Sequence, residues 1–296
     1  MPKRLHLVAA LTAVLLWSGC ETNVDPFIED DRFYTIFGYL DTATDLQALR
    51  VVPLRQVIGE ESQTIDATVL STELETGATV EWQPERIEYS DGSSGFVFRG
   101  ALRPIPGFTY RIDVVRSDGA SASAQTTIPP APGIAVSEPE IAVADVFQRV
   151  FWEDIPAAPF RVEIWYRFMG VTPSDPFLDA VLTYQDVKFG QARNGGWEAI
   201  VRLTEDRLLV AQELDVSEDA ALTLLGVGAR LTMSDDAWRP PGGVFDREVL
   251  VQPGTFSNVD NGFGFLGAVN QFTAEWTLTP ELTERIGYSF PGSAAD

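Results

Sequence analysis

The sequence contains a single histidine, His6, and a single cysteine, Cys20, and both lie within its first twenty residues. Without further imidazole or thiol groups the chain cannot build Ser-His-Asp or Cys-His nucleophilic centres, and it lacks the usual zinc, copper and haem ligands. A lone cysteine also excludes an intrachain disulfide. The composition therefore predicts a protein that is not an enzyme of these kinds, holds no cofactor and no metal ion, and is stabilised by its core alone.

Lysine is nearly absent as well, because Lys188 is the only lysine after residue 19. Acidic residues outnumber basic ones by 43 to 21, which gives a formal net charge of −22. Such a surface repels phosphates and anionic lipid headgroups, so nucleic acid is excluded as a partner. The acids are dispersed rather than grouped in blocks, which is typical of a solvated surface. A surface selected to bind cations or a basic partner is the alternative.

Residues 1–19 have the order of an export signal, with Lys3 and Arg4 followed by an apolar run from Leu5 to Trp17. This run is shorter than the roughly 20 residues that a membrane-spanning helix needs. The small residues before Cys20 resemble the end of a bacterial lipoprotein signal, which implies cleavage after residue 19 and lipidation of Cys20. An ordinary signal peptide with an incidental cysteine is the alternative. Residues 20–31 then form the lipidated cysteine and an acidic leash.

Residues 32–128 alternate between short apolar segments and turns, which predicts an all-β fold. The clearest alternation is Phe108-Thr109-Tyr110-Arg111-Ile112-Asp113-Val114. Its apolar residues, which begin with Phe108, face a core, and the polar residues between them face solvent. About seven strands in about one hundred residues are typical of an immunoglobulin-like or transthyretin-like β-sandwich. Trp82 is a candidate core aromatic residue.

Closely spaced prolines at residues 129–134 predict a linker, because proline removes ladder donors and stiffens the backbone. A proline-rich turn inside one large sandwich is the alternative. Residues 135–296 predict a second, sandwich-like β-domain, in which Phe160, Val162, Ile164, Tyr166 and Phe168 share the core face of one strand. One or two short helices are expected in this domain, one capped by Thr204 and another that begins with Thr279-Pro280 and ends near Gly287.

The segment Phe256-Ser257-Asn258-Val259-Asp260-Asn261-Gly262-Phe263-Gly264-Phe265-Leu266-Gly267 resembles the closing motif of an uncharacterised family of Bacteroidota-type lipoproteins. The lipidated cysteine, the early strand Phe37 to Leu40, the strand Gly107 to Val114 and the exit Thr126 to Pro129 match the same order. The resemblance implies a domain of unknown function encoded near TonB-dependent transporters. It further implies a lipid-anchored location at the outer membrane, on either the periplasmic or the cell-surface face.

Besides the lipidation site Cys20, two sets of residues are candidate sites. Asn258, Asp260 and Asn261 offer side-chain oxygens beside glycine amides, so they form a candidate ligand or cation loop. A tight turn in which Gly262, Gly264 and Gly267 adopt positive φ and Phe263 and Phe265 fill the core is the alternative reading. Trp165 and Trp238 are candidate binding aromatics. Trp165 is out of phase with the core face of its strand, and buried packing between domains is its alternative role.

These features together predict a non-catalytic, lipid-anchored envelope protein. Its expected role is that of a binding or scaffold component accessory to an outer-membrane uptake system, with a TonB-dependent transporter as the expected partner. A glycan hydrolase that uses paired carboxylates is one alternative, because such enzymes need no histidine. A structural or adhesive surface module is the other.

Overall fold

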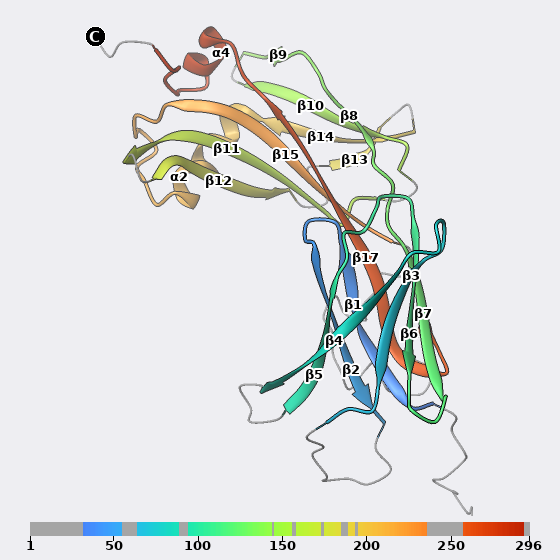
Figure 1. Cartoon of the computed structure of the whole chain (residues 1–296). Coiled ribbons are helices and arrows are strands. Elements are labelled where there is room, and N and C mark those ends of the chain that lie inside the picture. Colours follow the sequence, from blue (N-terminus) through green and yellow to red (C-terminus); the bar gives the residue numbers. More distant parts are fainter. Residues whose placement is uncertain are drawn as a thin grey trace, which may run out of the picture. The chain divides into compact units, whose positions relative to one another are not determined.

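Two β-sandwiches connected by one long strand make up the part of the chain that the structure describes (Figure 1). The structure is a computed structural model that describes residues 32–54, 64–88, 94–143, 145–155, 158–172, 175–184, 189–192, 195–235 and 257–292. Apart from two helices, the regular elements of these residues are all strands, so the predicted all-β fold class is confirmed. Neither helix has the length and the apolar composition that crossing a membrane requires.

The first sandwich has the strand order of an immunoglobulin-like domain. In constant-type immunoglobulin domains, strands A, B, E and D form one sheet and strands C, F and G form the other. The same order appears here as β1-β2-β5-β4 and β3-β6-β7. These strands are β1 (Tyr34–Asp41), β2 (Leu46–Pro53), β3 (Thr68–Glu73), β4 (Thr79–Glu88), β5 (Ser94–Ala101), β6 (Thr109–Val115) and β7 (Ser121–Thr127).

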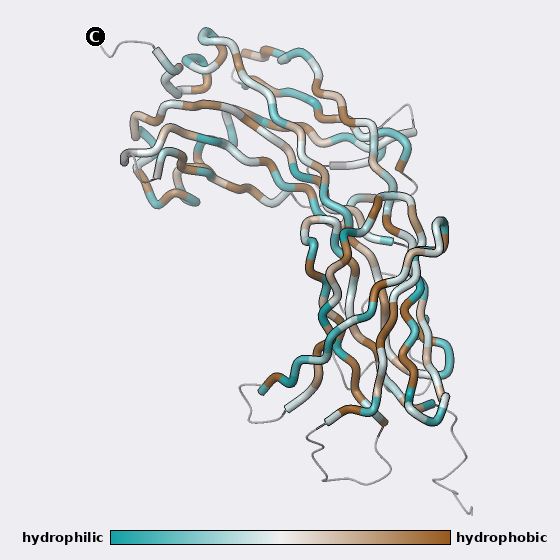
Figure 2. The backbone as a smooth tube through the Cα atoms, in the orientation of Figure 1, coloured by the Kyte–Doolittle hydropathy of each residue, from teal (hydrophilic) through white to brown (hydrophobic). Residues whose placement is uncertain are grey.

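Strand β4 links the two sheets, because residues 79–82 pair with β3 and residues 83–88 pair with β5. Trp82 lies at this crossover, is 1% exposed, and donates from its indole nitrogen to Ser71 Oγ at 3.0 Å. Its ring lies against Gly100, where an added Cβ would be 2.4 Å from the indole. The prediction that Trp82 is a core residue is therefore confirmed, and Gly100 leaves the space that the indole fills. Apolar and polar residues alternate along these strands (Figure 2).

Tyr110 forms the tyrosine corner that is a hallmark of immunoglobulin-like folds. It lies at the start of β6, its hydroxyl accepts from Ile105 N at 3.0 Å, and the same hydroxyl donates to Glu73 Oε2 at 2.9 Å. Burial, the largest cause, raises the pKa of Tyr110 to about 12. Burial likewise raises the pKa of Tyr34 to about 12. Both hydroxyls therefore stay protonated in the folded protein at neutral pH.

Alkaline pH is expected to unfold the protein through these tyrosines. A tyrosine in the unfolded chain ionises near pH 10, whereas Tyr34 and Tyr110 ionise near pH 12 in the fold. The unfolded state thus releases protons first, and the stabilisation present below pH 10 is lost as the pH rises to about 12. Urea unfolding at stepped pH, combined with tyrosinate absorbance, measures this. Tyr110→Phe should flatten the loss, and full tyrosinate formation by pH 10.5 without unfolding would contradict it.

The second sandwich also has an immunoglobulin-like strand order, but its sheet of strands C, F and G carries one additional strand, called C′. One sheet has the order β13-β14-β10-β8, and the facing strands have the order β12-β11-β15-β17. The members are β8 (Gly133–Val136), β9 (Glu140–Ile141), β10 (Val146–Glu153), β11 (Arg161–Thr172), β12 (Asp175–Tyr184), β13 (Phe189–Gln191), β14 (Trp197–Arg202), β15 (Leu224–Ser234) and β17 (Gly262–Trp276). Helix α2 (Leu203–Glu213) connects β14 to β15, and α4 (Pro280–Arg285) follows β17.

The strand β17 belongs to both sandwiches. Its residues from Gly262 to Val269 pair in parallel with β1, and its residues from Val269 to Trp276 pair antiparallel with β15. The short strand β16 (Val259–Asp260) precedes it and pairs with β7. Leu266 and Ala268 are thus part of the first core, although the sequence placed residues 135–296 in a separate domain. The predicted linker 129–134 also overlaps β8, which begins at Gly133.

Several local expectations changed in the structure. Phe160 was expected on the core face of its strand, but it is 52% exposed because β11 begins one residue later. The predicted cap Thr204 does not cap α2; its hydroxyl instead accepts from Val146 N at 3.1 Å. The other expected helix is confirmed, since Thr279 caps α4, Pro280 opens it, and Gly287 follows its end with φ +87°.

Candidate functional site

Trp165 lies flat on the outer face of the second sandwich. It points away from the core that Ile164 and Tyr166 enter, yet it is only 5% exposed. Its cross-strand neighbour on β15 is Gly228, where an added Cβ would be 2.2 Å from the indole ring. The absence of a side chain at Gly228 therefore lets the indole cover the backbone of β15. The indole of Trp165 therefore lies against the sheet and does not project into solvent.

Arg167 packs on top of this indole. Its guanidinium lies 4.7 Å from the centroid of Trp165 and 5.3 Å from that of Phe177, within the range of cation–π attraction. Asp179, directly across on β12, accepts two hydrogen bonds from it at 2.9 Å each. Hydrogen bonding to Asp179 is the largest cause that raises the pKa of Arg167, so the guanidinium remains charged. The forked pair fixes the cation between the two rings.

Met169 and Phe177 continue the same row of cross-strand pairs. They lie directly opposite each other on β11 and β12 and are 53% and 52% exposed. The backbone beneath them is held, because Met169 N donates to Thr223 O at 2.9 Å. A register shift relative to β15 occurs between Arg167 and Phe168. We call the residues Trp165, Arg167, Met169, Phe177 and Asp179 the hairpin face.

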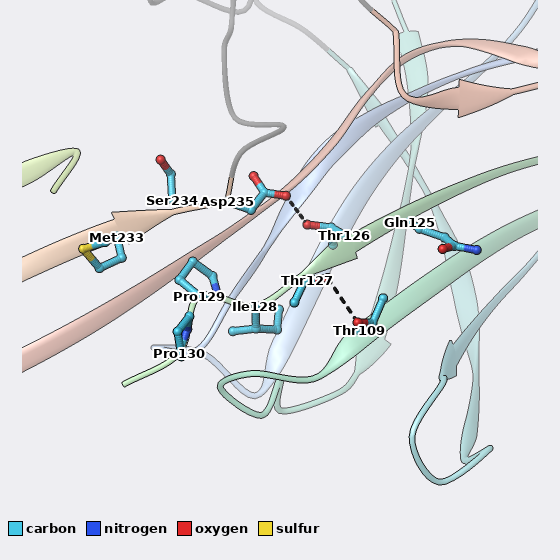
Figure 3. A pocket seen from close by; sticks show the side chains of 10 residues that line it. All are labelled: Thr109, Gln125, Thr126, Thr127, Ile128, Pro129, Pro130, Met233, Ser234 and Asp235. Atoms are coloured by element: carbon cyan, nitrogen blue, oxygen red, sulfur yellow. Dashed lines mark hydrogen bonds between the residues drawn. The ribbon is translucent and has the colours of Figure 1, made fainter. Parts of the chain in front are cut away.

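A second candidate is a pocket of about 350 Å³ beside the end of β7 (Figure 3). Its walls come from residues 125–130, residues 233–235 and Thr109, and its volume falls in the usual range for small ligands. Its polar groups pair with one another: Thr126 Oγ1 donates to Asp235, and the hydroxyls of Thr109 and Thr127 lie 3.1 Å apart. No basic side chain lines it, so its chemistry does not suit an anion.

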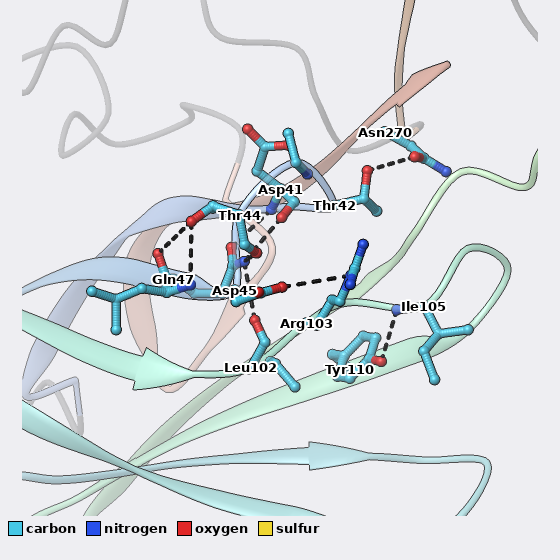
Figure 4. Close-up of polar contacts among 12 residues, drawn as sticks. Asp41, Thr42, Thr44, Asp45, Gln47, Leu102, Arg103, Ile105, Tyr110 and Asn270 are labelled. Carbon is cyan, nitrogen blue, oxygen red and sulfur yellow. Dashed lines mark hydrogen bonds and ion pairs between the residues drawn. The ribbon is translucent and has the colours of Figure 1, made fainter. Parts of the chain in front are cut away.

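The ends of β1 and β15 meet β17 close to this pocket. Asn270 is 1% exposed and donates from Nδ2 to Pro129 O at 2.7 Å, while its Oδ1 accepts from Thr42 Oγ1 at 2.6 Å. The neighbouring turn is closed by Gln47, whose Nε2 donates to Thr44 O at 2.6 Å and to Asp41 O at 2.9 Å (Figure 4). These satisfied amides fix the chain where the proline-rich segment leaves the first sandwich, so they serve structure.

The most deeply buried carboxylate, Asp206, also serves the core. It is 0% exposed in the first turn of α2, and its Oδ2 accepts from the hydroxyls of Tyr166, at 2.7 Å, and Tyr184. Burial first, and then the Asp206 charge, raise the pKa of both tyrosines well above the ordinary value. The phenols therefore remain donors. This group fastens α2 to the sheet, and the sequence reading missed it because acids in a first helical turn are usually solvated.

The predicted loop of Asn258, Asp260 and Asn261 contains the short strand β16 and its connection to β17. Asn258 Oδ1 accepts from Leu266 N at 2.9 Å and its Nδ2 donates to Leu266 O at 2.6 Å, so the amide pairs with β17 as a backbone group would. Asp260 and Asn261 are exposed, and Asn261 has φ 51°. Among the glycines of this motif only Gly264 has positive φ, and Phe265 is buried whereas Phe263 is half-buried under Arg32.

The two other predicted sites, Cys20 and Trp238, lie outside the described residues. Within the described ranges no group of three or more Asp, Glu, His or Cys side chains is placed to hold a metal ion. The exposed pair Met169 and Phe177 was not singled out from the sequence. A signal existed for Met169, which continues the out-of-phase positions that begin with Trp165 on the same strand.

No protein-family model and no curated protein matches the sequence. One solved structure that matches is titled "Crystal structure of Dpr2 Ig1-Ig2 in complex with DIP-Theta Ig1-Ig3". It is 12% identical, covers 80% of this chain and 95% of that chain, and has a TM-score of 0.20. Because that TM-score is low, the immunoglobulin-like assignment rests on the strand order of this chain and on its tyrosine corner.

Proposed function

We propose that this chain is a non-catalytic binding or scaffold protein of the bacterial envelope, held by a lipid on Cys20 and presenting its second sandwich to a protein partner. The observation that carries the proposal is the hairpin face. Two large apolar side chains, Met169 and Phe177, stand half exposed beside a fixed guanidinium on a rigid sheet. Exposed apolar groups of this kind, rimmed by polar residues, mark protein interaction sites.

Strand β17 runs from the beginning of the first sandwich to the neighbourhood of this face. Residues 20–31 connect Cys20 to Arg32, just before β1, and Tyr34 pairs with Gly262 at the first residue of β17. The other end of β17, Trp276, pairs with Val227, two strands from Phe168 and Met169. A strand of 15 residues extends for about 50 Å along its path. The shared strand therefore separates the pairing with Tyr34 from the neighbourhood of the binding face by most of its own length.

A TonB-dependent transporter is the partner that the lipoprotein resemblance implies, and we include it in the proposal. The net charge of −22 fits this choice better than a lipid or nucleic-acid partner, because both of these carry like charge. The accessory role is the one that this resemblance implies, and the hairpin face supplies binding geometry for it.

Crosslinking in membranes tests the proposal. The wild-type chain should sediment with the outer membrane, carry a diacylglyceryl thioether at Cys20 by intact mass, and co-purify with a barrel transporter after mild crosslinking. Cys20→Ser should leave the protein in the soluble fraction and abolish the crosslink, because both acyl chains are lost. Cys20→Ser fused to a different lipoprotein anchor serves as the control and should restore it. A wild-type protein with an unmodified thiol at Cys20, or one that yields no partner, would overturn the proposal.

A further inference from the structure

The hairpin face presents two apolar side chains, and the ring of one of them, Phe177, is already held in place. Met169 and Phe177 form a direct cross-strand pair, and the ring of Phe177 is held against the guanidinium of Arg167. That guanidinium is itself fixed by two hydrogen bonds to Asp179. Side chains that are ordered before binding lose little conformational entropy when a partner covers them. The pair therefore has the properties of a small hot spot that awaits a complementary surface.

Two carboxylates lie beside the guanidinium of Arg167. Asp179 and Glu275 flank Arg167 on the same sheet face, with side chains 40% and 52% exposed. These two carboxylates outnumber the single guanidinium of Arg167, so the rim that they form carries a net negative charge.

We infer that the hairpin face docks a polypeptide segment in which an apolar or aromatic side chain lies between lysines or arginines. The apolar residue would cover Met169 and Phe177, while the flanking cations would meet the carboxylates of the rim, as complementary interfaces require. This inference rests on the proposed function, because it names the partner chemistry of that same face.

Two other occupants fit the charge less well. A second copy of this chain would bring the same acidic rim and the same net charge of −22 against it, so like charges would oppose association. An anionic membrane surface would be repelled for the same reason. A basic, apolar segment satisfies both the exposed rings and the carboxylates.

The full mature protein can be titrated into a fluorescein-labelled synthetic peptide that carries Phe and Leu between Lys and Arg residues. The matched control is the same peptide with Glu in place of every Lys and Arg. Anisotropy should report binding of the basic peptide only, and binding should weaken as salt is raised from about 50 to about 300 mM. Phe177→Ser and Met169→Ser should each weaken it about tenfold, as expected for central contacts. Phe160→Ser, which removes an equally exposed ring just before the first residue of β11, should leave it unchanged.

Equal losses from Phe160→Ser and Phe177→Ser would overturn the inference, since binding would then be non-specific. Binding of the acidic peptide, binding to vesicles of anionic phospholipid, or a concentration-dependent dimer lost in Phe177→Ser would overturn it in favour of another occupant. The result is separable from the proposed function. If the membrane crosslink persists unchanged in Phe177→Ser, the protein still has a partner and only this assignment of the face fails.

Discussion

Replacing Gly264 with alanine is expected to lower the free energy of unfolding by about 4 kcal/mol or more. Gly264 has φ +101°, a region that L-residues adopt only with strain. An added Cβ would also lie 2.0 Å from Ile36 O, which belongs to the neighbouring strand β1. Backbone cannot rotate aside as a flexible side chain would, so the parallel pairing of β1 with β17 must open. Because β17 serves both sandwiches, the loss should spread from the first to the second.

Urea unfolding followed by tryptophan fluorescence measures the total loss, and hydrogen exchange of β1 and β15 amides shows how far it spreads. Gly107→Ala is the matched control, because Gly107 has φ +84° but no atom within 4 Å of an added Cβ. It should cost only the strain, about 1 to 2 kcal/mol. Equal losses at the two glycines would show that the contact with Ile36 is unimportant. Unchanged exchange in β15 would show that the sandwiches unfold independently.

The parts of this fold that sequence predicts well are those set by local pattern. The alternation around Tyr110 and Ile112 predicted β6 because one side of that strand faces a core and the other faces solvent. The start of α4 followed from Thr279 and Pro280, whose chemistry suits a helix N-terminus regardless of context. Such signals depend on neighbours in sequence, so they survive in any tertiary arrangement.

The pairing between strands that are far apart in the sequence could not be predicted from local patterns. The motif around Gly264 reads as a turn because it is rich in Asn and Gly, yet it forms β16 and the first half of β17. The reason is its partner: Ile36 on β1 lies more than two hundred residues earlier and accepts a strand only where Gly264 omits its side chain. The burial of Trp165 also depends on a distant residue, because its indole fits only where Gly228 lacks a side chain. The local sequence pattern does not indicate that this position must be glycine.

Replacing Asp206 with alanine is expected to lower the free energy of unfolding by about 3 to 5 kcal/mol, because two buried phenol hydroxyls lose their hydrogen-bond acceptor. The hydroxyls of Tyr166 and Tyr184 both donate to Asp206 Oδ2, and all three residues are nearly inaccessible to water. An alanine would leave both donors unsatisfied and would open space at the start of α2. The loss should therefore appear both in urea unfolding and in faster hydrogen exchange of α2.

A set of variants at the same three positions separates the polar penalty from the cavity. In Tyr166→Phe/Tyr184→Phe/Asp206→Leu the donors and the acceptor disappear together, and the leucine fills the space. This triple variant should be more stable than Asp206→Ala alone, because replacing a whole buried polar group by apolar ones of similar volume is often nearly neutral. If it is less stable than Asp206→Ala, the hydrogen bonds are not what fastens α2. If Asp206→Ala costs less than about 1 kcal/mol, solvent reaches the phenols, and the contact between α2 and the sheet is looser than the burial of Asp206 indicates.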